Sequence, residues 1–213
     1  DGHPAGDVTT PGTFTDRLAA KSVFRDFAIT GTAIARRQVV DIAKCDVCHD
    51  VLSLHGANRN DEPGVCVVCH NPNATDAGRR PSAGGVLTGG VDGKLEEAVD
   101  FKTMIHAIHA GHQSEGGFRE NGIVIYGFGG SVNDFSPVDF PGKLANCTAC
   151  HTSTSYQLTG IWDSPTASGI LGTTTSTGTS WSDAADNLRT SPTTAVCSSC
   201  HDSSRVRVHF TGL

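Results

Sequence analysis

Four copies of a five-residue pattern, Cys-x-x-Cys-His, are the part of this sequence best suited to carry chemistry. Each cysteine of such a copy can form a thioether with one vinyl group of the same porphyrin, and the following histidine then binds the iron as proximal ligand. The cysteines are Cys45, Cys48, Cys66, Cys69, Cys147, Cys150, Cys197 and Cys200, and the adjoining histidines are His49, His70, His151 and His201. Because the four copies use all eight cysteines, the pattern predicts four covalently bound c-type haems.

Three other cysteine chemistries fit the pattern less well. A zinc ribbon needs two Cys-x-x-Cys pairs fifteen to twenty residues apart, which only the first two pairs satisfy. A disulfide scaffold does not favour pairs that are each followed by histidine. A thioredoxin-like redox pair needs one Cys-x-x-Cys in a βαβ context, which the sequence does not show.

The histidines outside the motifs decide whether each iron has a second, distal ligand or keeps an open position for a substrate. Six of the ten histidines remain after the proximal ones: His3, His55, His106, His109, His112 and His209. Four irons need four distal ligands, and the best placed are His55, His106, His109 and His209. His106 and His109 are three residues apart on a predicted helix, so they share a face and can reach two different haems. His112 could replace His109, and His3 could reach a haem of another copy of the chain.

Composition favours a core built from cofactor. Only 37% of the 213 residues are hydrophobic and 6% are aromatic, which is low for this length. Four large apolar porphyrins would compensate, at about 53 residues each. We therefore expect mostly irregular structure, with short helices and a small β-hairpin, wrapped around four haems.

The net charge and the start of the sequence indicate which partners and which cellular location to expect. The formal charge of −6 would fall to about −14 with eight ionised propionates, which disfavours nucleic acid and anionic membranes as partners. No run of eighteen apolar residues predicts a transmembrane helix. The chain opens at Asp1 without a signal peptide, and c-type haem is attached outside the energy-coupling membrane. We therefore expect the mature form of an exported protein.

The predicted organisation has three parts. Residues 1–20 form a flexible arm, residues 21–44 a hairpin around Gly31 and Thr32, and residues 45–213 the tetrahaem domain. Within the last part we expect a helix over 95–110 ended by Gly111, with Phe101, Met104, Ile105 and Ile108 on its buried face. We also expect a strand at 123–128, a solvated Ser/Thr-rich loop at 164–180 that could carry O-glycans, and an extended tail at 206–210.

The sequence resembles the OmcA/MtrC family of outer-surface multihaem cytochromes over residues 25–210. The resemblance rests on Arg36-Arg37-Gln38-Val39-Val40-Asp41, on Leu52, Leu54 and His55-Gly56, on Arg59, on the second motif with Asn71-Pro72, on residues 101–111, on Phe140-Pro141 and Asn146, and on the last motif with His209. It implies closely spaced bis-histidine haems that move electrons outwards to minerals, electrodes, soluble acceptors or other cytochromes. It also implies an extracellular or outer-surface location, with the periplasm as the alternative.

The sequence departs from that family in size. Typical members carry about ten haems, in haem domains that alternate with β-barrel-like domains, whereas this chain has four motifs and only a predicted hairpin. A lone tetrahaem unit suggests a monomeric shuttle, a piece of a larger decahaem protein, or the repeating subunit of a cytochrome filament. In a filament, His3 could bind a haem of the next subunit.

Two function classes follow from the state of the irons. If distal histidines close every iron, the protein is an electron carrier and not an enzyme, and its haems lack the methionine ligand that raises potential. The alternative is a multihaem reductase with one open iron. All four motifs are regular, without a lysine in place of the proximal histidine, which disfavours a reductase. We expect the cationic pairs Arg36-Arg37 and Arg79-Arg80 to be solvated surface.

Overall fold

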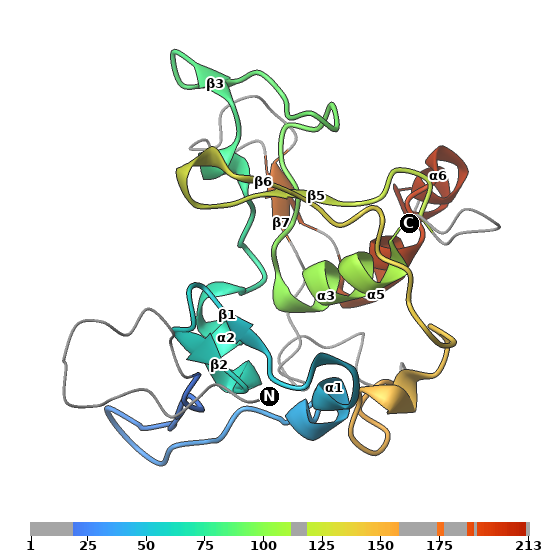
Figure 1. Cartoon of the computed structure of the whole chain (residues 1–213). Coiled ribbons are helices and arrows are strands. Elements are labelled where there is room, and N and C mark those ends of the chain that lie inside the picture. The colour runs from blue at the N-terminus through green and yellow to red at the C-terminus, as the bar shows by residue number, and fades with distance from the viewer. Residues whose placement is uncertain (1–18, 112–118, 158–173, 177–186, 190, 212–213) are drawn as a thin grey trace, which may run out of the picture.

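The computed structural model describes residues 19–111, 119–157, 174–176, 187–189 and 191–211, and little of this chain is regular (Figure 1). The helices are α1 (Ile42–His49), α2 (Pro63–Cys69), α3 (Phe101–Ala110), α5 (Pro192–Cys200) and α6 (Ser204–Thr211), and the 3-10 turns are η1 (Ala77–Arg79), η2 (Phe128–Gly130) and η3 (Cys147–Ala149). The antiparallel strand pairs are β1 (Ser53–Leu54) with β2 (Arg59–Asn60), β3 (Ser82–Ala83) with β4 (Val86–Leu87), β5 (Val124–Tyr126) with β6 (Val132–Asp134), and β7 (Thr174–Ser176) with β8 (Asn187–Arg189). Short helices joined by long irregular segments were expected from the sequence, and this is what the described chain shows.

Side-chain caps start three of the helices that carry a motif. Asp41 accepts a hydrogen bond from Ala43 N–H at the start of α1, and Glu62 accepts one from Gly64 N–H at the start of α2. Ser191 does the same for Thr194 N–H at the start of α5. Such caps satisfy backbone donors that a helix leaves unpaired at its first turn. Each of these caps therefore helps to fix where its motif turn begins.

Helix α3 begins at Phe101, six residues later than predicted. The residues before it are held extended: Ala98 bridges Thr75, and Val99 N–H donates to Ala74 O at 2.9 Å. Because these backbone groups already pair with residues 74–76, they cannot enter the helix. The predicted end is confirmed, since Gly111 has φ +50° and donates its N–H to Ala107 O at 3.1 Å.

The buried face of α3 consists of small residues rather than the large ones that the sequence suggested. Thr103, Ala107 and Ala110 are buried, and α3 packs against α5, whose Ala195 and Ser199 are buried too (Figure 1). Small side chains allow the two helix backbones to approach closely. The four large apolar residues, Phe101, Met104, Ile105 and Ile108, are only half-buried.

The hairpin predicted for residues 21–44 is absent from this segment, all of which the structure describes. Its two halves pair elsewhere: Ser22 N–H donates to Asn60 O at 2.9 Å, whereas Val40 bridges His151. Thr152 N–H adds a bond of 3.0 Å to Val39 O. The β-branched residues thus hold an extended segment against two of the motif regions, which a local reading of the sequence could not foresee.

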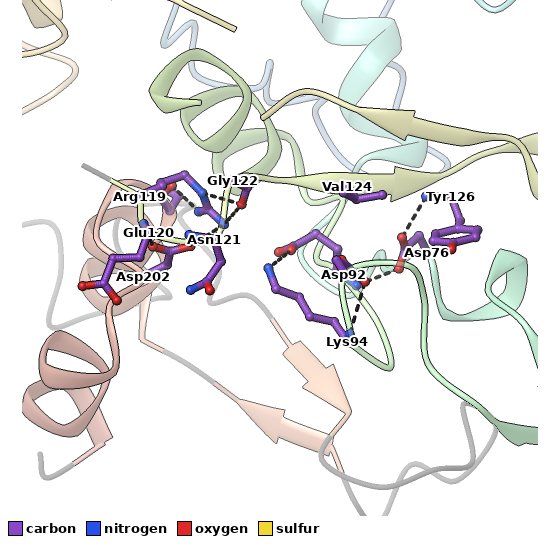
Figure 2. A network of polar contacts seen from close by, with 12 residues as sticks. Asp76, Asp92, Lys94, Arg119, Glu120, Asn121, Gly122, Val124, Tyr126 and Asp202 are labelled. Atoms are coloured by element: carbon purple, nitrogen blue, oxygen red, sulfur yellow. Dashed lines mark hydrogen bonds and ion pairs between the residues drawn. The ribbon is translucent and has the colours of Figure 1, made fainter. Parts of the chain in front are cut away.

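A buried ionic network anchors the β5–β6 pair. Arg80 is 4% exposed, donates from Nε to Asp76 at 2.8 Å and from Nη1 to Asp92 at 2.7 Å, and lies 4.9 Å from the ring of Tyr126. Asp76 also accepts from Tyr126 N–H at 2.9 Å, as Figure 2 shows. Arg36, Arg37 and Arg79 are exposed, as expected, but the prediction of a solvated Arg80 is wrong. The expected strand at 123–128 is present as β5.

The tail at 206–210 belongs to α6 and is not extended. Ser203 Oγ accepts from Val206 N–H at 3.3 Å, in the manner of a helix cap. The alternation of polar and apolar residues there resembled a strand, but the cap favours the helix. His3, His112, most of the 1–20 arm and most of the 164–180 loop lie outside the described residues. No helix in the described part is both long and apolar enough to cross a membrane.

Candidate haem-binding sites

All four motifs lie on helical turns. The first lies in α1, the second and fourth end α2 and α5, and the third forms η3. In the last three, the histidine N–H donates to the carbonyl of the first cysteine: His70 to Cys66 at 3.0 Å, His151 to Cys147 at 3.0 Å, and His201 to Cys197 at 2.9 Å. A helical turn places residues i and i+3 on one face, so the two cysteines of each motif point the same way.

Three motif histidines each face a histidine from elsewhere in the chain. The ring centres of His49 and His109 are 5.9 Å apart, those of His70 and His55 are 6.1 Å apart, and those of His151 and His106 are 6.1 Å apart. The ring planes differ by 87°, 27° and 12° in the same order. Three of the four distal histidines named from the sequence therefore lie opposite a proximal one.

These separations suit an iron held between two imidazoles. A metal–imidazole bond is about 2 Å long and the ring centre lies about 1 Å behind the ligating nitrogen, so two axial histidines have ring centres about 6 Å apart. A bare contact between two rings has no reason to repeat this separation three times. The residues present therefore fit axial ligation of c-type haem.

Two different elements supply the facing histidines. Helix α3 carries His106 and His109 and points them at two different motifs, the third and the first, as the spacing suggested. His55 comes from the turn between β1 and β2, with φ +54°, a left-handed conformation uncommon outside glycine. This turn folds His55 back over the second motif instead of the first, whose His49 is nearer in sequence.

Hydrogen bonds orient several of these rings through Nδ1. His70 Nδ1 lies 2.7 Å from Val99 O, and His109 Nδ1 lies 2.8 Å from Ile105 O. His151 Nδ1 lies 3.2 Å from Ser155 Oγ, and this hydroxyl donates to Val39 O at 2.6 Å. With Nδ1 carrying the proton, Nε2 is left as the atom that can bind a metal.

Burial keeps the third pair of imidazoles neutral. Desolvation, with repulsion from His151 next in size, lowers the pKa of His106 to about 4. Desolvation also lowers the pKa of His151. A neutral imidazole is the form that binds a metal, so both rings are ready for ligation at neutral pH.

One cysteine thiol of each motif is poorly suited to redox or nucleophilic chemistry. Burial raises the pKa of Cys45 to about 11, and it also raises the pKa of Cys66, Cys150 and Cys200. Catalytic thiols need the opposite shift, because the thiolate is the reactive species. Within the described ranges, no group of three or more His, Cys, Asp or Glu residues could hold a bare metal ion.

The fourth motif is fixed by a buried arginine that the sequence did not single out. Arg119, 3% exposed, donates to Ser199 O inside the motif at 2.6 Å and to Gly122 O at 2.7 Å. It also pairs with Asp202 at 3.2 Å, directly after the motif (Figure 2). His201 and His209 are exposed, on the C-cap of α5 and in α6, and their pairing stays a prediction.

Further residues around the motifs carried no signal in the sequence. Lys44 precedes the first motif but donates to the third, with Nζ 2.6 Å from His151 O and 2.9 Å from Thr148 O. The rings of Phe140 and Tyr156 lie edge-on to His109 and His151, at 5.8 and 6.2 Å. Of these residues, only Phe140 is among those that carry the family resemblance.

Comparison with known proteins identifies a family. The family model described as outer membrane cytochrome MtrC/MtrF-like, domains II/IV, matches residues 37–212, which include all four motifs. No curated protein and no solved structure matches the chain significantly.

Proposed function

This chain belongs to the MtrC/MtrF-like family of outer membrane cytochromes, and on that premise we propose that it relays electrons along four closely spaced c-type haems at the outer cell surface. Membership of the family implies c-type haem and electron transfer. The number of four haems rests on the four motifs and their eight cysteines. In this proposal, each haem is held by two thioethers and a proximal histidine.

The pairing of histidine rings supports an electron carrier rather than an enzyme. An iron between His106 and His151, or in either of the other two ring pairs, has no position left for a substrate. For the fourth iron we propose His201 as proximal ligand and His209 as distal ligand, with His112 as the alternative. The protein then exchanges electrons with redox partners such as other cytochromes or extracellular minerals, without breaking or forming bonds in them.

Contacts between motifs support a continuous path for the electrons. Sites one and three share helix α3, because His109 and His106 are three residues apart on it. Cys147 lies near enough to Cys200 for a weak electrostatic interaction, which supports neighbouring third and fourth sites. The chain from His49 to His55 spans sites one and two. We therefore propose the order two, one, three, four for the haems along the path.

A test of the carrier function uses the reduced holoprotein and two kinds of oxidant. Ferric citrate should reoxidise all haems by outer-sphere transfer, whereas nitrite and sulfite should not be turned over. The matched control is the same protein with one iron opened deliberately by the variant His106→Gly. Steady turnover of either oxyanion by the unmodified protein would contradict the proposal and favour a reductase.

We further propose that the tetrahaem unit assembles into a homopolymeric filament. The extended segment before the first motif leaves Val23, Phe27, Ile29 and Ile34 between 82% and 93% exposed, and a row of apolar side chains of this kind suits contact with another subunit. His3 lies on the arm before this segment, where it could bind a neighbour's haem. Electron microscopy and sedimentation over rising concentration test the assembly. A protein that stays monomeric, and whose haem spectra are unchanged in His3→Ala, would contradict it.

A further inference from the structure

Lys44 joins the first motif helix to the third haem site, and it brings a positive charge there. Its ammonium donates to His151 O at 2.6 Å and to Thr148 O at 2.9 Å. In the described part of the chain, no carboxylate pairs with it. Arg37, which is exposed, adds a second positive field at the same histidine, and this field is no weaker than that of Lys44. A positive charge beside an iron favours the ferrous state, which carries one positive charge fewer than the ferric state.

The hydrogen bonds at this site act in the same direction. His70 and His109, at the other two sites, donate from Nδ1 to backbone carbonyls at 2.7 and 2.8 Å. His151 instead donates to the hydroxyl of Ser155 at the longer distance of 3.2 Å, and the carbonyl of Val39 acts on the same ring from further away. A strong acceptor on Nδ1 makes an imidazole more basic and stabilises ferric iron, so the longer bond to a hydroxyl gives less of this stabilisation.

His106, whose ring faces His151, is the least well supported of these histidines by hydrogen bonds at Nδ1. His106 Nδ1 is buried and makes no regular hydrogen bond to a described residue, although the carbonyl of Lys102 lies close enough to act on the ring and partly offset the lowering of its pKa. Both axial ligands of the third site are therefore weaker electron donors than ligands bonded to carbonyls. Burial of the ring also lowers the local dielectric constant, which disfavours the more highly charged ferric form.

We propose that the third site, Cys147 and Cys150 with His151 and His106, has the highest reduction potential of the three sites with paired rings, and that the ammonium group of Lys44 helps to raise it. The inference rests on the proposed axial ligation. The first electron that enters these three sites then resides at the third, next to the fourth site and at the centre of the proposed path. Lys44 acts through the peptide groups of the motif and is a positioning residue, not a ligand.

An EPR-monitored redox titration of the holoprotein tests the inference. Nearly parallel axial imidazole planes give a rhombic low-spin signal, whereas perpendicular planes give a single feature at large g, so the first site can be told from the other two. Reduction should remove one rhombic signal first. Lys44→Gln, which keeps the hydrogen-bonding length but not the charge, should move that midpoint to lower potential. Lys21→Gln, on an exposed lysine near Asn60, should leave it unchanged.

Two substitutions of Ser155 separate tuning from a general loosening of the site. Ser155→Ala removes the acceptor on His151 and should raise the same midpoint, whereas Ser155→Asp provides a carboxylate acceptor and should lower it. A general loosening of the site would admit water and shift the midpoint in the same direction in both variants. An unshifted midpoint in Lys44→Gln, with all haems present, contradicts this inference alone. Absence of haem on Cys147 and Cys150 in the mass of the unmodified protein contradicts the proposed function as well.

Discussion

The imidazoles of His106 and His151 face each other with their ring centres 6.1 Å apart and their planes 12° apart, although 45 residues separate them in the chain. His109, one helical turn beyond His106, faces His49 with planes 87° apart. One ten-residue helix thus faces two of the motifs and presents its two rings in contrasting orientations. This arrangement makes the two sites distinguishable by spectroscopy and by mutation.

Replacing the facing histidines one at a time should change one site each. His106→Met should raise the potential of the third haem and alter a rhombic EPR signal, because methionine is a weaker donor to ferric iron than imidazole. His109→Met, three residues away, should instead remove the feature at large g. The measurement is EPR of the oxidised variants. Identical changes in both variants would contradict the assignment of two separate sites.

Alanine at Gly111 should be far more destabilising than alanine at Gly93. Both glycines have positive φ, +50° and +72°, and Gly111 combines it with ψ −155°, close to the region that only glycine adopts, so an alanine is strained at both positions and more so at Gly111. A Cβ at Gly111 would also lie 2.0 Å from Val138 O, whereas a Cβ at Gly93 meets nothing within 4 Å. Denaturant unfolding of the two variants measures the additional cost at Gly111 of the clash and of this backbone conformation. Equal losses would mean that the chain around residue 138 can move aside without cost.

Removing Arg80 should destabilise the fold by about 3–5 kcal/mol, because it leaves buried carboxylates of Asp76 and Asp92 without their partner. The adjacent Arg79 is a matched control, since it is exposed and its guanidinium lies 5.8 Å from the centre of the exposed ring of Phe128. Arg79→Gln should therefore stay within about 0.5 kcal/mol of the unmodified protein. The measurement is the free energy of unfolding of Arg80→Gln and of Arg79→Gln. Similar values for the two variants would show that the buried network contributes little to stability.

The same network predicts acid sensitivity. Burial alone would raise the pKa of Asp92, but hydrogen bonds from Arg80 and Lys94 outweigh it and leave the pKa below its usual value. A carboxylate with a lowered folded-state pKa stabilises the fold fully above the unfolded-state value of about 4, and this stabilisation is lost as the pH falls further. The difference in unfolding free energy between unmodified protein and Asp92→Asn should therefore narrow from pH 6 to pH 3. A constant difference would contradict the argument.

Local features of the sequence predicted the motif turns, the end of α3, strand β5 and three of the histidines that face a motif. Each depends on residues within a few positions of one another. The failures involve partners distant in sequence: Val40 pairs with His151, and the buried Arg80 donates to Val124 O, 44 residues away. Neither Lys44 nor Ser155 could be linked to the third site before the chain was folded, because Lys44 lies 107 residues from His151 and serine four residues after a motif has no special meaning.

Low-temperature EPR of the fully oxidised holoprotein, with spins quantified per haem, tests the central claim most directly. The account predicts that every iron is low-spin with two histidine ligands, and that the three ring pairs give two rhombic signals and one feature at large g. A high-spin signal equivalent to one haem per chain would contradict it, because an open iron could bind substrate and the protein would not be a pure electron carrier.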